Sequence, residues 1–217
     1  MDIPVGTNVE RRQVVKAMAT GSTLEALGGA AAVVLAILGL ARIAPNYMLP
    51  IAGIVIGATL LAQGGLSTAE ASRLVSGADT TQKVEVEGGF GAEGLAGAAA
   101  IVLGILALIS IDPLVLMSVS AIVLGAGLLL EGAGVAAMAR TAVIDETMSG
   151  AHTTHNVMAG SAGAQVLVGL AAIVLGILAL VGLNSIVLDL VAMLAIGAGM
   201  LLSGAALGGR MVKVAAR

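Results

Sequence analysis

Residues 98–131, AAAIVLGILALISIDPLVLMSVSAIVLGAGLLLE, contain two long apolar segments, a short polar break at Asp112 and Pro113, and a final glutamate. A bilayer core about 30 Å thick requires roughly 20 mostly apolar residues per helix, so each segment is close to the length that crosses a membrane. Proline suits the first turn of a helix, where its missing N–H would have no partner, and an aspartate before it can cap that helix. The stretch therefore predicts a helical hairpin whose turn lies at Asp112.

This hairpin occurs three times in the chain. Its first half recurs at offsets of 68 and 72 residues, as AAAVVLAIL from Ala30, AAAIVLGIL from Ala98 and LAAIVLGIL from Leu170. Its second half recurs at the same offsets, as IVIGATLLAQG from Ile54, IVLGAGLLLEG from Ile122 and LAIGAGMLLSG from Leu194. Because one pair of offsets aligns both halves, the repeating unit is a whole hairpin. We expect an all-α integral membrane protein with six transmembrane helices, arranged as three tandem helical hairpins in a pseudo-threefold bundle.

The composition also indicates a membrane protein. Of 217 residues, 59% are hydrophobic and 11% are charged, and the mean hydropathy is +1.09; the apolar share exceeds that of soluble domains. The absence of cysteine excludes disulfides and thiolate chemistry, and a net charge of -3 without a basic run argues against nucleic-acid binding. Trp is absent and Tyr and Phe occur once each, although aromatic residues usually anchor membrane proteins at both interfaces. We therefore expect two kinds of partner, membrane lipid and further subunits of a homo-oligomer or a larger membrane complex.

Short turns and longer polar linkers alternate along the chain. The turns centre on Ala44, Asp112 and Asn184, whereas the connections between hairpins are longer and rich in Gly, Thr and Ser, as surface linkers are. The expected organisation is a cytoplasmic N-terminal segment at 1–21, hairpins at 22–75, 92–143 and 164–217, the last including a cytoplasmic C-terminus, and linkers at 76–91 and 144–163.

The distribution of Lys and Arg predicts the orientation. Nine of the ten cations precede the first helix, follow the last, or lie in or beside the linkers: Arg11, Arg12, Lys16, Arg73, Lys83, Arg140, Arg210, Lys213 and Arg217. Because cytoplasmic loops carry an excess of Lys and Arg, we expect a multi-pass protein of the inner (cytoplasmic) membrane with both termini in the cytoplasm. Arg42 and Asp189 lie near turns, and we expect their side chains to reach the outer interface.

Small residues recur four positions apart in every repeat. Helices in lipid associate by close packing of such residues, because lipid tails are as apolar as leucine. We interpret these positions as helix-packing sites within the chain, with a neighbouring copy as the alternative partner. They are Ala32, Ala36, Ala100, Gly104, Ala172 and Gly176 in the first helices of the hairpins, and Gly53, Gly57, Ala121, Gly125, Gly204 and Gly208 in the second.

Polar residues recur as well, and we call these six the polar layer. They are Glu25, Glu93 and Gln165 in the first helices, and Gln63, Glu131 and Ser203 in the second. Each lies nineteen residues from the centre of its turn. At 1.5 Å per residue this is about 28 Å, near the cytoplasmic edge of the hydrocarbon.

Two interpretations of the polar layer are open. Its residues mark the interface where the lipid ends, with Glu25 and Glu93 near helix starts where the dipole favours a carboxylate. Alternatively they form a proton-responsive cluster, in which neighbouring carboxylates couple protonation to helix packing. The interfacial interpretation is favoured because charge costs less at the bilayer edge than at its centre. Glu131 is the candidate for a buried carboxylate, because its helix continues with apolar residues.

No arrangement typical of catalysis occurs in the sequence. His152 and His155 have a spacing that suits metal binding, but a third ligand is not evident, and Gly150, Thr153 and Thr154 indicate a loop. Nucleophile elbows and phosphate loops are absent. We expect no enzymatic activity, no cofactor and no metal site.

The second repeat carries a series of short motifs. They are GILAL at 104–108, Asp112–Pro113, Leu124–Gly125 and LLEG at 129–132. The third repeat keeps GILAL at 176–180 with Asn184–Ser185 in place of Asp–Pro, and the first keeps Pro45. This series resembles the short repeat of HdeD-type acid-resistance membrane proteins. The resemblance implies six helices in three hairpins and an inner-membrane protein associated with acid or envelope stress.

The functional expectation is a non-enzymatic structural or accessory inner-membrane protein that acts through assembly with itself or with a larger complex. The alternative is a proton or small-solute channel or transporter that uses the polar layer. A conduit needs polar residues at several depths, whereas the sequence shows one populated layer and isolated residues near the helix ends. This pattern favours the structural role.

Overall fold

The computed structural model describes residues 6–74, 80–109, 111–146 and 152–215, with side chains for 22–64, 91–109, 111–133 and 163–205. The described chain consists of α-helices joined by turns. The helices are α1 (Gly6–Leu40), α2 (Pro45–Leu74), α3 (Thr80–Leu108), α4 (Pro113–Glu146), α5 (His152–Leu180) and α6 (Ser185–Ala215). The prediction of an all-α chain with six helices is confirmed.

Each helix contains a stretch that is long and apolar enough to cross a membrane. These stretches are Ser22–Leu40, Pro45–Gly64, Gly91–Leu108, Pro113–Ala133, Gly163–Leu180 and Ser185–Ala205. Half of the α2 stretch is buried inside the protein, but only 28% of the α1 stretch and 22% of the α5 stretch. α2 therefore lies further inside the bundle than α1 and α5.

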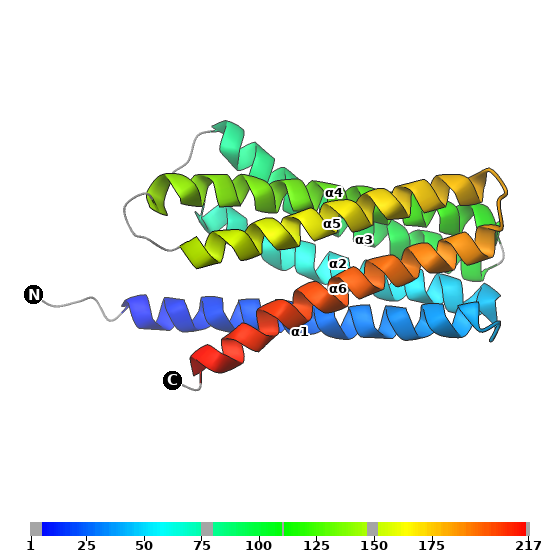
Figure 1. Cartoon of the computed structure of the whole chain (residues 1–217), viewed down its shortest axis with the longest axis horizontal. Coiled ribbons are helices and arrows are strands. Elements are labelled where there is room, and N and C mark those ends of the chain that lie inside the picture. Colours follow the sequence, from blue (N-terminus) through cyan, green and yellow to red (C-terminus); the bar gives the residue numbers. More distant parts are fainter. Residues whose placement is uncertain (1–5, 75–79, 110, 147–151, 216–217) are drawn as a thin grey trace, which may run out of the picture.

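The six helices lie side by side and form a closed ring. The three hairpin turns gather at one end of the bundle, and α1 begins and α6 ends at the other (Figure 1). Each helix packs against its neighbours in the chain. α6 also packs against α1, and this contact is more extensive than the contact between α1 and α2. α2, α4 and α6 also contact one another, so these three helices line the centre and the other three lie outside them.

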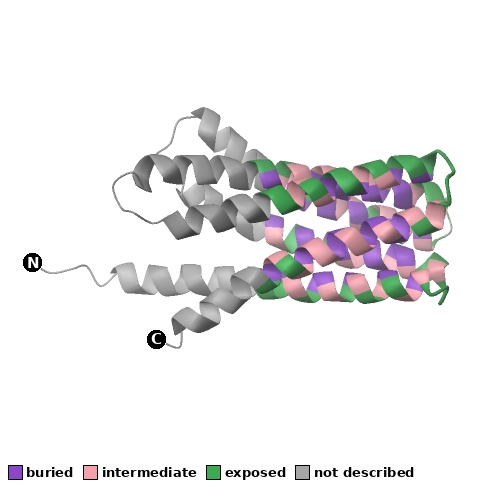
Figure 2. Cartoon of the chain, in the orientation of Figure 1, coloured by how far each residue is buried: buried purple, intermediate pink, exposed green. Residues whose placement is uncertain are grey.

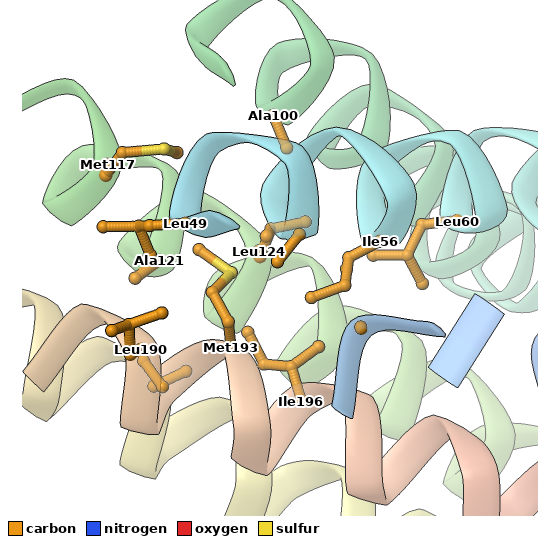
Figure 3. Packing of buried hydrophobic residues seen from close by; sticks show 14 of the residues in the cluster. Leu49, Ile56, Leu60, Ala100, Met117, Ala121, Leu124, Leu190, Met193 and Ile196 are labelled. Atoms are coloured by element: carbon orange, nitrogen blue, oxygen red, sulfur yellow. The ribbon is translucent and has the colours of Figure 1, made fainter. Parts of the chain in front are cut away.

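The core follows the central axis of α2, α4 and α6. It is built in levels to which all three helices contribute at repeat-equivalent positions: Ile56, Leu124 and Ile196 form one level, and Leu60, Leu128 and Met200 form the next. Side chains of the first level converge with Met193 between the helices (Figure 3). The outward faces are exposed along the bundle (Figure 2) and carry large apolar side chains, including Leu27, Leu95 and Leu167. Such a continuous apolar surface is typical of a face that meets lipid or another protein.

Each turn contains a residue with positive φ just before the next helix. Ala44, Asp112 and Asn184 have φ values of 45°, 40° and 46°. The carbonyl oxygen of each accepts a hydrogen bond from an N–H in the first turn of the following helix, as Leu116 N–H donates to Asp112 O at 3.1 Å. These residues therefore start the helices through their backbone carbonyls.

Paired glycines form close contacts between helices. Gly57 of α2 lies against Gly97 of α3, Gly125 of α4 against Gly169 of α5, and Gly197 of α6 against Gly29 of α1. A Cβ added at any of the six would lie 2.4 to 3.1 Å from the partner's carbonyl oxygen. The three pairs are related by the repeat offsets of 68 and 72 residues. Only glycine permits this approach of two backbones.

The packing positions inferred from the sequence lie inside the bundle wherever side chains are described. These buried positions are Ala32, Ala36, Gly53, Gly57, Ala100, Gly104, Ala121, Gly125, Ala172, Gly176 and Gly204. Gly104 faces Pro50 and Ile54 of α2, so the partner is another helix of the same chain. Gly208 lies outside the described side chains. The four-residue spacing did not identify Gly29, Gly97, Gly169 or Gly197.

The helices extend into the stretches expected to be linkers. α3 begins at Thr80 and α5 at His152, so much of 76–91 and of 144–163 is helical. The expectation of a loop at Thr153 and Thr154 is wrong, because both lie in the first turn of α5. The side chains of His152 and His155 lie outside the described set.

Candidate functional site

The polar layer is a contact network inside the bundle, and each of the six helices contributes one side chain to it. Glu25 of α1, Gln63 of α2, Glu93 of α3, Glu131 of α4, Gln165 of α5 and Ser203 of α6 are its members. The structure therefore brings together all six residues that the repeat offsets had placed at one level. Their proximity follows from the ring, because equivalent positions of packed repeats meet at one depth.

Hydrogen bonds connect most of these side chains across helix boundaries. Gln165 Nε2 donates to Glu131 Oε1 at 2.7 Å, joining α5 to α4. Ser203 Oγ is hydrogen-bonded to Glu25 Oε1, joining α6 to α1, and the side chain of Gln63 is also hydrogen-bonded to Glu25. Two of the three carboxyl groups are thus held by amide or hydroxyl partners from neighbouring helices.

Glu93 is the most deeply buried carboxyl group of the layer. Its side chain is 1% exposed, compared with 7% for Glu25, and Glu131 is only partly buried. Glu93 Oε1 has no hydrogen-bond partner among the described residues. Opposite it, α4 has Gly127, where an added Cβ would lie 3.8 Å from Glu93 Cα. The sequence names Glu131 as the candidate for a buried carboxylate, and by exposed side-chain area Glu93 is covered more completely.

The three carboxyl groups lie close enough to repel one another when ionised. Glu93 experiences the charges of Glu131 and Glu25, and Glu131 experiences the charge of Glu25. Among the described side chains, Arg42 is the only Lys or Arg, and it lies in the turn at the opposite end. Within those side chains, no three His, Cys, Asp or Glu residues are arranged to hold a metal ion. The layer is thus a cluster of carboxyl groups without a described counter-ion.

A second polar cluster lies near the turns, and we call it the Asp189 site. It consists of Asp189 of α6 and Ser118 of α4, neither more than 1% exposed. Ser118 Oγ and Asp189 Oδ2 are 2.8 Å apart and hydrogen-bonded. The expectation that Asp189 reaches the outer interface is wrong, because the residue points into the bundle, where Ser118 supplies a partner.

Repeat comparison contained the signal for the Asp189 site. Asp189 occupies the position of Leu49 in the first repeat and of Met117 in the second, and both are core residues. Its closeness to the third turn suggested a surface location instead. Position within a repeat is the better guide here, because it specifies the face of the helix as well as the depth.

Ser118 and Ser203 lie in the same kind of place in the two clusters. Each hydroxyl is 3.0 Å from the carbonyl oxygen four residues earlier in its helix, Leu114 or Gly199, and each also contacts a carboxyl oxygen. A hydroxyl has one proton to donate. When the serine donates that proton to the carbonyl oxygen, its hydrogen bond to the carboxyl group requires the carboxyl group to be protonated and to donate to the serine oxygen. Both serines can therefore hold a neutral acid and exchange donors with it.

The chain matches no protein-family model, and neither a curated protein nor a solved structure shows significant similarity to it.

Proposed function

We propose that this chain is a proton-responsive integral membrane protein, in which the polar layer binds protons and links their binding to the packing of the six helices. In this proposal the three hairpins form a pseudo-threefold bundle in the inner membrane, with both termini in the cytoplasm. The role is non-enzymatic and structural or accessory. A response to protons agrees with the acid-stress association implied by the resemblance to HdeD-type proteins.

The observation that supports the proposal is the meeting of Glu25, Glu93 and Glu131 inside the bundle without a described cation. An ionised carboxylate in an apolar interior is costly unless it is paired. Carboxylates that share a site cannot all ionise easily, since each added charge repels the others. Bound protons would remove this charge and the repulsion that goes with it.

The hydrogen bonds give the layer a way to affect packing. Glu25 connects α1 with α2 and α6, and Glu131 connects α4 with α5. Glu93 joins α3 to the cluster only through its position against α4 and the other two carboxyl groups. Ionisation of all three would add repulsion at the level where every helix contributes a side chain. The packed bundle should therefore bind protons more tightly than a loosened one.

The sign of the pH dependence follows from this linkage. If the packed state holds more protons than the unfolded state, stability decreases as the pH rises. For the wild type in mild detergent, we expect the thermal midpoint Tm to fall by roughly 5 °C or more between about pH 5 and about pH 8. The measurement is the loss of the monodisperse particle on heating.

Substitutions of the carboxyl groups test where this dependence arises. Glu93→Gln should flatten the dependence of Tm on pH, because an amide keeps the size of the side chain and cannot ionise. Asp112→Asn, at an exposed turn residue, is the matched control and should keep the wild-type slope. If Glu93→Gln does not fold, the dependence of Tm on pH is measured in Glu25→Gln and Glu131→Gln instead. A wild-type Tm that is independent of pH, or an unchanged slope in all three Glu→Gln variants, would contradict the proposal.

A further inference from the structure

The Asp189 site lies on the central axis of the bundle, at the end nearest the turns. Leu49, Met117 and Asp189 are repeat-equivalent and buried on the three central helices. The position has a large apolar side chain in two repeats and a carboxyl group in the third. Burial of a carboxyl group is unfavourable compared with burial of leucine or methionine. Packing therefore does not explain why the third repeat has aspartate at this position.

Asp189 Oδ1 has no hydrogen-bond partner among the described residues, and neither has Ser120 Oγ, two residues after Ser118 on α4. Ser120 lies toward α2, where its Oγ is 3.8 Å from the Cβ position at Gly53. Buried polar atoms are nearly always paired with protein or water. These two atoms are therefore suited to bind water that enters between the central helices.

The polar layer contains the third atom of this kind. Glu93 Oε1, Asp189 Oδ1 and Ser120 Oγ are the buried side-chain atoms without a partner in the described part of the chain. The first belongs to the polar layer, the second to the Asp189 site, and the third lies on the central helix α4. On α6, Asp189 and Ser203 are fourteen residues apart, which corresponds to about 21 Å along the helix. The clusters thus lie at two depths that together span much of a bilayer core.

Two apolar levels separate the clusters. Ile56, Leu124 and Ile196 are 0% exposed. Leu60, Leu128 and Met200 form the level next to the polar layer, and none is more than 3% exposed. Rings of apolar side chains exclude water from a narrow axis and open when they separate or become polar, as hydrophobic gates of channels do.

We propose that the axis of α2, α4 and α6 is a proton path that connects the Asp189 site with the polar layer, and that the two apolar levels are its gate. This inference depends on the proposed function in one respect, that the polar layer binds protons. It goes beyond that function by assigning a second site and transport of protons across the bundle. The structure represents the closed state of the gate.

Each step on this path moves only a proton between oxygen atoms. A proton from the turn side binds to the Asp189 carboxylate, with Ser118 exchanging donor and acceptor roles beside it. Water that enters between the apolar levels when they separate accepts the proton and passes it to Glu131 or Glu93. Release from the layer to the opposite side restores the starting state. One O–H bond breaks and one forms in each transfer, and nothing is oxidised or reduced.

Asp189 is the buried ionisable side chain among the described residues at the turn end of the bundle, and we assign it as the proton acceptor there. The neighbouring ends of α1, α3 and α5, residues 33–40, 101–108 and 173–180, contain no ionisable side chain. α2 contributes Tyr47, and the turns contribute Arg42 and Asp112, but these three side chains are exposed. At the other end, the carboxyl groups that face the path are those of the polar layer.

Proton uptake by vesicles tests the path. The full chain is reconstituted into vesicles of phosphatidylethanolamine and phosphatidylglycerol that contain a pH-sensitive dye, and a potassium gradient with valinomycin drives proton entry. Leu124→Ser should raise the initial rate of uptake about tenfold over the wild type, because a hydroxyl admits water to the gate. Adding Asp189→Asn to Leu124→Ser should return the rate to that of the wild type. Val174→Ser, on the exposed face of α5, is the control and should leave the rate unchanged.

Each result decides the inference. Ile196→Ser replaces Leu124→Ser if the latter is not monodisperse in detergent. Folded gate variants without increased uptake overturn the path, and so does increased uptake that is insensitive to Asp189→Asn. The two proposals fail separately. A Tm that depends on pH through Glu93 with no uptake in any gate variant rejects the path alone, whereas uptake that requires Asp189 with no pH dependence of Tm rejects the proton-responsive packing.

Discussion

Arg42 and Gly182 occupy equivalent places in the first and third turns, and both have positive φ, 63° and 91°. Each ends its helix in the same way. The N–H of Arg42 donates to Gly39 O, and the N–H of the next residue, Ile43, donates to Leu38 O; Gly182 and its successor repeat this pattern with α5. This is the Schellman motif, in which glycine is preferred because a Cβ is strained at positive φ. Arginine in this place is therefore under local strain.

Relief of that strain should stabilise the protein. Arg42→Gly is expected to raise the free energy of unfolding by about 0.5 to 1 kcal/mol. The variant removes the cost of holding arginine in the left-handed backbone conformation, and the larger entropy that glycine loses on folding offsets part of this gain. Gly182→Arg should lower it by a similar amount. Arg42→Ala removes the charge but retains the Cβ, so it should give no gain. The midpoints of unfolding in detergent measure all three, and a gain for Arg42→Ala equal to that for Arg42→Gly would assign the effect to the charge.

For individual residues of the site, depth in the bundle could be predicted from sequence, but the degree of burial could not. The repeat offsets placed Glu25, Glu93 and Glu131 at one depth, because depth depends only on distance from the turn. They did not say which carboxyl group would be deepest. That depends on the neighbouring helix, and Gly127 of α4 lies against the stretch of α3 that contains Glu93 and Ala96. Closeness to the turn suggests a surface location for Asp189, whereas its repeat position places it in the core with Leu49 and Met117.

At the scale of the helices, a glycine on one helix of each hairpin lies opposite a larger residue on the other helix. Gly28 of α1 faces Thr59 of α2, and an added Cβ there would clash with the threonine side chain. In the other hairpins the sizes are reversed. Ala96 faces Gly127, and Val168 faces Gly199. A larger residue on one helix is met by a smaller one on the other, so the interaxial distance is kept with different side chains.

Contacts between successive hairpins are less tolerant, because both members of each pair are glycine. Four-residue spacing identified Gly57 and Gly125 but not their partners Gly97 and Gly169. Spacing along one helix marks a face that packs closely, and it carries no information on which helix covers that face. The partner became clear only from the ring, in which the second helix of one hairpin packs on the first helix of the next.

Two glycines of α5 provide a matched test of this contact. At Gly169 an added Cβ would lie 2.6 Å from Gly125 O, whereas at Gly163 nothing lies within 4 Å. Gly169→Ala should lower the free energy of unfolding by about 1 to 3 kcal/mol, the usual cost of overpacking. Gly163→Ala should leave it unchanged or raise it by up to about 1 kcal/mol through helix propensity. Equal unfolding midpoints for the two variants in detergent would show that α4 and α5 do not pack at these glycines.

At the scale of the whole molecule, the fold separates the charges along the bundle. Eight cations lie in the parts of the helices far from the turns: Arg11, Arg12, Lys16, Arg73, Lys83, Arg140, Arg210 and Lys213. Of the Lys and Arg residues in the described helices and turns, only Arg42 lies at the end where the turns gather. The sequence predicted this asymmetry without any tertiary contact, because helix direction reverses at each turn. Closure of the ring by α1 and α6 required the structure, since the two helices are far apart in the chain.

The separation of charge predicts which end of the bundle faces the cytoplasm. Lys and Arg are retained on the cytoplasmic side during insertion, so the three turns should face outward. The natural chain lacks cysteine, and single cysteines report accessibility without background. Asn46→Cys, at the exposed start of α2, should react with a membrane-impermeant maleimide in intact cells. His152→Cys, at the start of α5, should react only after permeabilisation, which also shows that both thiols are reactive. The reverse pattern would place the polar layer near the outer surface and the Asp189 site near the cytoplasm, and protons on the proposed path would then enter through the glutamates.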